Sequence, residues 1–194
     1  MKMNKRITLT AFALLCASII CHSLSAQSVK HVEVEPYIGL GLPLRDIGGK
    51  EIRETAGLDA GIEFRYNLQE MPISVGADLN VSAAARTKDI SEGRVSHNSQ
   101  RMVSLTAICD WNFRQGDNVA FFTGVGLGLA QRETIQPGID RGIGICPTYG
   151  LVAAPRIGIE LWNHFRFTLE TRITQRDYNV IAFRLGIPLG GGRQ

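Results

Sequence analysis

The sequence has little of the residue chemistry that metal centres and redox sites require. It contains four cysteines in 194 residues. Cys16 and Cys21 lie in an N-terminal segment that we expect to be removed, and our strand assignment places Cys109 and Cys146 near opposite ends of the fold, too far apart for a disulfide. No phosphate-binding glycine loop, zinc-ligand spacing or calcium loop occurs. We therefore expect no catalytic site, no cofactor and no metal.

A long hydrophobic helix is also missing. The longest apolar run, Ile7–Ile20, is shorter than the roughly 20 residues that a membrane-spanning helix needs. Basic residues precede it and small residues follow it up to Ala26, which is the pattern of a secretory signal. We predict a cleaved signal peptide over residues 1–26 and one mature domain over residues 27–194, exported to the cell envelope.

An excess of basic charge is absent from that mature domain. The chain has 21 Lys+Arg and 18 Asp+Glu, but Lys2, Lys5 and Arg6 all precede the first acid, Glu33. Without the signal peptide the two signs balance. The sequence therefore offers no basic surface for nucleic acid.

What the sequence does contain is alternation. Apolar residues occupy every second position from Leu58 to Leu68 and again from Ile73 to Ala85, with a short polar turn between, so this stretch predicts an antiparallel hairpin. The intervening face carries Gly, Ser, Ala and Asn with isolated Asp, Glu and Arg, but no Lys. Sheet faces in water usually carry longer charged side chains, including Lys. We interpret the apolar face as facing lipid and the small polar face as lining a narrow interior.

The same alternation recurs along the whole mature chain. It predicts an all-β fold, an eight-stranded antiparallel up-and-down transmembrane β-barrel whose strands of roughly ten residues suit a tilted bilayer crossing. The predicted strands cover residues 31–42, 57–68, 73–86, 103–113, 119–130, 149–161, 165–174 and 181–189. Short and long links alternate, as periplasmic turns and external loops do in such barrels. We expect the loops 45–56, 87–101 and 131–148, and the brief link 175–179, to face outward.

Aromatic residues give independent support. They gather beside the three short turns, as an interfacial girdle would. The members of this girdle are Phe64, Tyr66, Trp111, Phe113, Phe121, Trp162, Phe165 and Phe167.

The leader, the eight alternating strands, the glycine-rich segment Phe121–Leu129 and the closing segment Val180–Leu189 together resemble the porin-like "outer membrane protein β-barrel domain" family of Gram-negative bacteria. The resemblance covers the mature chain through its pattern. It implies a location in the outer membrane, with membrane lipid and the barrel-assembly machinery as partners.

Charged residues on inward positions are the most concentrated ionic feature of the sequence. They could form a polar pathway or ligand site, but we favour structural ion pairs that fill the lumen, because a barrel of eight strands has just enough interior for its own side chains. The candidates are Glu63, Arg65, Asp78, Arg86, Asp110, Arg156, Glu160, Arg166, Glu170, Arg172 and Arg184.

One short motif suggests an enzyme. His97 and Ser99 have a spacing that resembles that of outer-membrane lipid A deacylases. Such catalysis also needs an acid that orients the histidine. The nearest downstream acid, Asp110, lies far along the next predicted strand, so we do not expect an enzyme.

We therefore predict a monomeric outer-membrane barrel with a structural or surface-interaction role, such as membrane integrity, adhesion or binding of an extracellular ligand through loops 45–56, 87–101 and 131–148. Three alternatives stay open. They are a narrow porin-like channel for small solutes, a lipid-modifying enzyme, and a secreted ligand carrier with its apolar face inward. The sequence does not identify a ligand.

Overall fold

The computed structural model describes residues 31–44, 53–54, 56–68, 71–90, 94–113, 118–137, 143–175 and 179–190. Side chains are described in these ranges except at residues 44, 53–54, 84–90, 94–100, 134–137 and 143–146. The predicted signal peptide, residues 1–26, lies outside them. No helix within these ranges is long and apolar enough to span a membrane.

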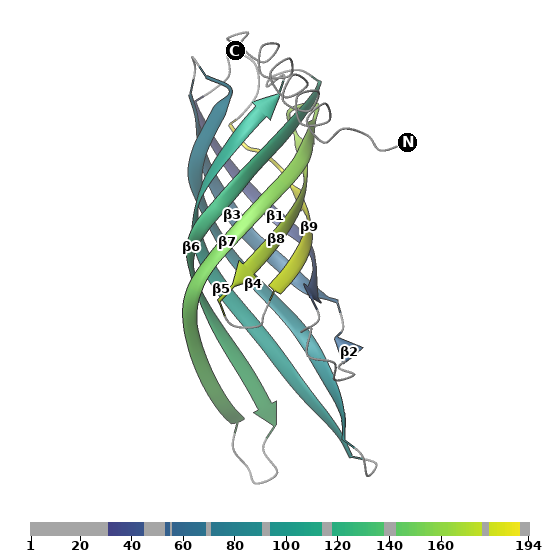
Figure 1. The fold of residues 1–194 in the computed structure, drawn as a ribbon. Coiled ribbons are helices and arrows are strands. Elements are labelled where there is room, and N and C mark those ends of the chain that lie inside the picture. Colours follow the sequence, from purple (N-terminus) through teal and green to yellow (C-terminus); the bar gives the residue numbers. More distant parts are fainter. Residues whose placement is uncertain are drawn as a thin grey trace, which may run out of the picture.

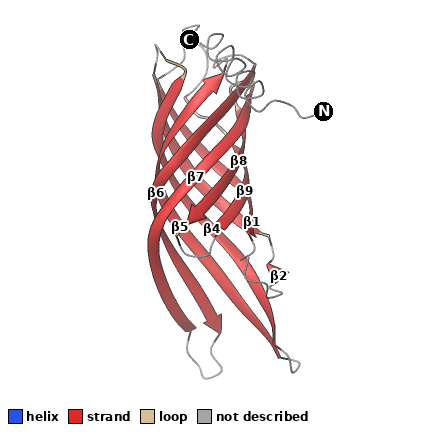
Figure 2. Cartoon of the chain, in the orientation of Figure 1, coloured by secondary structure: helices blue, strands red, loops and turns tan. Residues whose placement is uncertain are grey.

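The described elements are all strands (Figure 2). They are β1 (Val32–Leu44), β2 (Arg53–Glu54), β3 (Gly57–Asn67), β4 (Ile73–Ile90), β5 (Arg94–Phe113), β6 (Val119–Pro137), β7 (Ile143–Leu161), β8 (Phe165–Thr174) and β9 (Asn179–Gly186). Apart from the two-residue β2, each strand pairs antiparallel with the next, and β1 pairs with β9 to close the sheet. The predicted eight-stranded up-and-down β-barrel is confirmed (Figure 1).

The barrel is apolar outside and polar inside. Leu127 on the outer face is 61% exposed, whereas Asp59 and Arg172 on the inner face are fully buried. The alternation of each strand produces this inversion, since successive side chains point to opposite sides of the wall. The alternative of a secreted carrier with its apolar face inward is therefore wrong.

The aromatic girdle has the expected position beside the short turns. Six of its eight members are exposed on the outer wall, and Trp111 and Phe113 are half-buried. The tightest of these turns joins β7 to β8. Trp162 and Asn163 take φ values of 52° and 57° there, and the His164 N–H donates to the Leu161 carbonyl at 3.1 Å.

At the end of the barrel opposite the tight turns, the prediction of two long loops is wrong. Most of 87–101 and 131–148 is strand, because β4 continues to Ile90, β6 to Pro137, and the returning strands start at Arg94 and Ile143. Their mixed polarity resembles that of a loop, although their backbones stay paired. The β4–β5 and β6–β7 hairpins therefore extend beyond β8 and β9 (Figure 1).

These two hairpins form one sheet at the end opposite the tight turns, which we call the outer end, because β5 and β6 remain paired as far as Ser99 and Ile135. Its two side edges differ. Part of the predicted loop 45–56 forms β2, which pairs with β4 at Arg86 and Thr87. On the opposite edge, β8 pairs with β7 only from Val152 onward, so no described strand lies beside residues 143–151.

Candidate functional site

Ionisable side chains fill the lumen of the barrel. The buried arginines there are Arg65, Arg156, Arg166, Arg172 and Arg184. The described carboxylates are Glu33, Glu35, Asp59, Glu63, Asp78, Asp110, Glu160 and Glu170. Except for the half-buried Glu160, none of them is more than 4% exposed.

Asp110 on β5 organises one part of the network. The Arg156 guanidinium binds it in a bidentate manner, with Nε to Oδ1 at 2.7 Å and Nη2 to Oδ2 at 2.5 Å. Arg166 donates to the same carboxylate at 2.8 Å and lies over the Phe122 ring, 3.4 Å from its centroid. Arg156 also donates to Glu63 at 2.6 Å. One carboxylate therefore joins β5, β7 and β8 across the lumen.

A second part is built on Asp59 of β3 and Glu170 of β8. Arg184 donates to Asp59 at 2.9 Å and to Glu170 at 2.8 Å. Arg172 donates to the same two carboxylates at 2.8 and 2.9 Å. The Asn80 amide also donates to Asp59, at 3.1 Å. Two guanidinium groups and two carboxylates thus form a closed square inside the barrel.

Near the tight turns, Arg65 connects the acids of β1. Its Nη2 lies 2.6 Å from Glu35 and 3.0 Å from Glu33. Glu160 lies 3.3 Å from Arg166. All five buried arginines therefore contact carboxylates of other strands, which ties the wall together across its interior.

Glycines in the wall are covered by large side chains. An added Cβ would meet the Phe122 ring at Gly158, the Tyr37 hydroxyl at Gly61 and the Glu35 carboxylate at Gly186. Glycine weakens a strand unless another group needs its space. At these three positions the other group is present, and this part of the lumen is full.

Within this network the carboxylates outnumber the guanidinium groups, with eight against five among the described side chains. Glu35, Glu63 and Asp78 also lie directly opposite one another on β1, β3 and β4. Like charges in such positions destabilise a sheet. Arg184 partly relieves this row, since it lies 3.7 Å from Glu63 and 3.4 Å from Asp78. No described group of three acids, histidines or cysteines is arranged to hold a metal ion.

The structure brings together ten of the eleven predicted lumen residues. They are Glu63, Arg65, Asp78, Asp110, Arg156, Glu160, Arg166, Glu170, Arg172 and Arg184. The side chain of the eleventh, Arg86, lies outside the described residues. Sequence reasoning missed Glu33, Glu35 and Asp59, although each occupies an inward position of the same alternating pattern.

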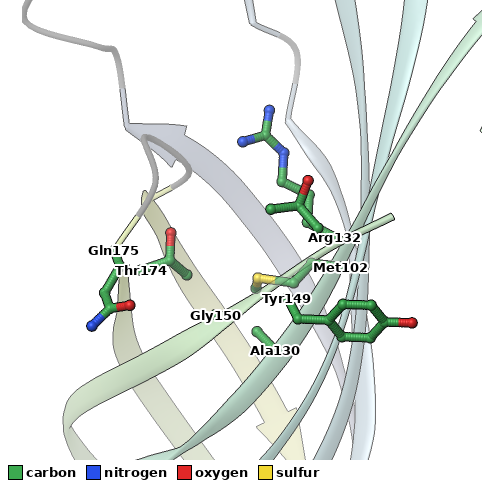
Figure 3. Close-up of a pocket in the computed structure, with 8 residues that line it drawn as sticks. Met102, Ala130, Arg132, Tyr149, Gly150, Thr174 and Gln175 are labelled. Atoms are coloured by element: carbon green, nitrogen blue, oxygen red, sulfur yellow. The ribbon is translucent and has the colours of Figure 1, made fainter. Parts of the chain in front are cut away.

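The outer end of the lumen differs from this network. Met102, Ala130, Val152 and Val180 form a buried apolar layer. Beyond it lies a cavity of about 90 Å³ lined by Met102, Ala130, Arg132, Thr148, Tyr149, Gly150, Thr174 and Gln175 (Figure 3). No carboxylate is among these lining residues.

The residues considered for catalysis do not converge. Asp110 is bound by Arg156 and Arg166, and it lies about 40 Å along β5 from His97 at the usual rise of a strand. It cannot orient that histidine, whose side chain lies outside the described residues. Cys109 is exposed on the outer wall without a disulfide, and the side chain of Cys146 is likewise not described.

Comparison with known structures supports the architecture. Neisserial surface protein A is similar over 84% of this chain and 99% of its own chain, at 10% sequence identity and a TM-score of 0.53. The fold is that of a small outer-membrane β-barrel. OprG from Pseudomonas aeruginosa is also similar, with a TM-score of 0.50 at 11% identity over 84% of this chain and 98% of its own.

The likeness does not extend to sequence. No protein-family model matches the chain, and no curated protein matches it either. Identities of 10–11% show the fold alone. The family resemblance in the sequence therefore holds at the level of a small outer-membrane barrel.

Proposed function

We propose that this chain is an integral protein of the outer membrane with a sealed lumen, and that its role is structural or lies in surface interaction at its outer end. The observation that carries the proposal is the filled interior. Arg172 and Asp59 are fully buried at its centre, 2.8 Å apart.

A sealed lumen argues against general solute flow. Ions could pass only if several of the buried ion pairs separated, and breaking one such pair costs about 3–5 kcal/mol when a partner charge is left behind. Each arginine here contacts more than one carboxylate, so opening a path requires several such losses. The glycine positions that would otherwise leave room are covered by Phe122, Tyr37 and Glu35.

The outer sheet supports a role at the surface. Strands β4 to β7 have 18–20 residues, whereas β8 has 10 and β9 has 8. Only about ten residues of each strand are needed to cross the bilayer. We infer that the remaining length forms a paired sheet outside the membrane, where it can present the loops to a ligand or a neighbouring surface.

Planar-bilayer recording tests the sealed lumen. We expect the purified mature protein, residues 27–194, to insert without steady conductance. Flotation with lipid vesicles and heat-modifiable migration on gels show independently that it has inserted and folded. Steady open conductance from protein that passes both controls would overturn the proposal.

Cell fractionation tests the location. We expect the mature protein in the outer-membrane fraction, with its N-terminus at Gln27 by mass spectrometry. Recovery in the soluble fraction without detergent, or retention of residues 1–26, would contradict this part of the proposal.

A further inference from the structure

Arg101 on β5 differs from the buried arginines of the lumen. It is exposed on the outer face of the wall, where no other described side chain of the strands belongs to an arginine or a lysine. Its register partner on β6, Glu133, accepts from Gln131 at 3.0 Å. No described acid pairs with Arg101. The described outer wall therefore carries one cation that has no acid bound to it.

The position of Arg101 along β5 fits the edge of the membrane. About ten residues of a strand cross the hydrocarbon layer. Counted from the tight-turn ends of β5, β6 and β7, that length ends at the apolar residues Val103, Leu129 and Leu151. The next outward positions hold the polar side chains of Arg101, Gln131 and Tyr149. Because tyrosine is enriched at the headgroup level of membranes, we expect this row at that depth.

A groove in the outer wall begins beside this row. It has a volume of about 210 Å³. The outward-facing residues that line it are Leu79, Val103, Leu105, Leu129, Gln131 and Tyr149. Val103 follows Arg101 by two residues on the same face of β5, so their Cα atoms are about 7 Å apart. The cation therefore lies at the polar end of a mostly apolar groove.

The size and charge of this surface indicate what it binds. A water-sized group needs about 10–15 Å³ of such volume, so the groove accommodates about fifteen of these groups, which suits a single acyl chain. A guanidinium binds phosphate through two parallel hydrogen bonds. A long arginine side chain can also lay its stem on apolar surface while its charge reaches the headgroups. An apolar groove next to one unpaired cation therefore matches a lipid that carries a phosphate.

We propose that this groove binds one phosphorylated lipid of the membrane leaflet at the outer end of the barrel. Arg101 holds the phosphate, Tyr149 lies beside the headgroup, and one acyl chain lies along Val103, Leu105 and Leu129. The inference rests on the proposed function only for the orientation of the barrel, which decides the leaflet.

Binding is testable with the folded mature protein in a non-ionic detergent. Phosphatidylglycerol, diacylglycerol and inorganic phosphate are titrated separately at constant ionic strength. NMR shifts of the amides of residues 101–105, 129–131 and 149–151 follow binding. We expect saturable binding of phosphatidylglycerol. Diacylglycerol lacks the phosphate and inorganic phosphate lacks the acyl chains, so each should bind at least tenfold more weakly.

A charge variant tests the role of the guanidinium. Arg101→Gln should weaken the binding of phosphatidylglycerol at least tenfold. The matched control is Glu133→Gln, which removes a charge from the register partner of Arg101 and leaves the guanidinium in place. This control should not weaken binding.

Filling the groove tests the place of the acyl chain. Val103→Trp puts a large side chain among the lining residues and should abolish binding. Ala107→Trp is its control, because Ala107 is exposed on the same face of β5 but does not line the groove. It should leave binding unchanged. Heat-modifiable migration shows that each variant has folded.

The outcomes separate the two proposals. The lipid site would be overturned by an absence of saturable binding, by equal binding of diacylglycerol or inorganic phosphate, or by binding that survives either Arg101→Gln or Val103→Trp. Shifts that depend on protein concentration instead of lipid would assign the groove to a second copy of the chain and would also overturn it. None of these results bears on conductance, which tests the sealed lumen. A conducting barrel that binds phosphatidylglycerol through Arg101 would overturn the proposed function and leave the lipid site intact.

Discussion

The inner and outer ends of the lumen share one wall but are filled differently. From the tight turns to the middle of the lumen, Gly158 and Gly61 are covered by Phe122 and Tyr37, and each buried arginine contacts several acids. At the outer mouth, Gly150 faces open space beside Arg132 in a cavity without a lining carboxylate. The same strands therefore enclose an interior packed with ion pairs at one end and an unfilled cavity at the other.

The strongest test of this difference is to break the packed end at Asp110. Asp110→Asn removes the charge shared by Arg156 and Arg166 and leaves both guanidiniums short of a partner in a buried site. We expect the free energy of unfolding to fall by about 3–5 kcal/mol. Urea unfolding of the refolded barrel in vesicles measures it.

The control is Glu133→Gln on the outside of the wall, where Glu133 contacts Gln131. A surface change of this kind should alter the free energy by less than about 0.5 kcal/mol. Equal effects of the two variants would show that the lumen network does not hold the barrel together.

The next largest expected change in the free energy of unfolding comes from replacing two glycines on β7. At Gly158 a methyl group would overlap the Phe122 ring and the Phe167 carbonyl oxygen, so Gly158→Ala should destabilise by about 1–3 kcal/mol. At Gly150 the same change meets no described atom, and Gly150→Ala should be neutral or stabilising by about 0.5 kcal/mol. Urea unfolding of both variants gives the difference directly. If Gly150→Ala lowers the free energy of unfolding more than Gly158→Ala does, the space beside Gly150 is not open.

The smallest effect is expected at Glu63. Glu63→Gln weakens its contact with Arg156, but it also removes one charge from the row that Glu63 forms with Glu35 and Asp78. Its Oε2 is buried without a hydrogen-bond partner, so little is lost at that atom. We expect a change of at most about 1 kcal/mol in the free energy of unfolding. A loss as large as that of Asp110→Asn would show that the carboxylates in this row do not repel one another.

The membrane-facing part of the fold could be predicted because lipid imposes a strict rule on it. Every second residue from Leu58 to Leu68 must be apolar. This pattern therefore predicts the strand, the side that faces lipid and the side that faces the lumen. Asp59 occupies an inward position of the same pattern and could have been predicted as a lumen residue together with Glu63. Under the proposed function the outer ends of β4 to β7 lie outside the lipid, so residues 87–101 and 131–148 carry no such pattern and their strands were mistaken for loops.

The difference between Gly150 and Gly158 could not be predicted at all. Both are glycines on inward positions of one alternating strand. Only the register shows that Gly158 lies opposite Phe122 and that Gly150 lies opposite Ala130. The size of the facing side chain, which is set by pairing between distant segments, decides whether the space is filled.

The edge of β7 over residues 143–151, where no described strand pairs on the side away from β6, has a consequence for association with other chains. Backbone amides of even-numbered β7 residues point to β6, as the Trp162 N–H does toward Asn118, so odd-numbered residues point to the open side. Pro147 is one of these and has no N–H to offer. A proline in the middle of residues 143–151 interrupts the row of donors that a stray strand would need for docking. Pro147 therefore makes this edge a poorer template for pairing with a strand of another chain.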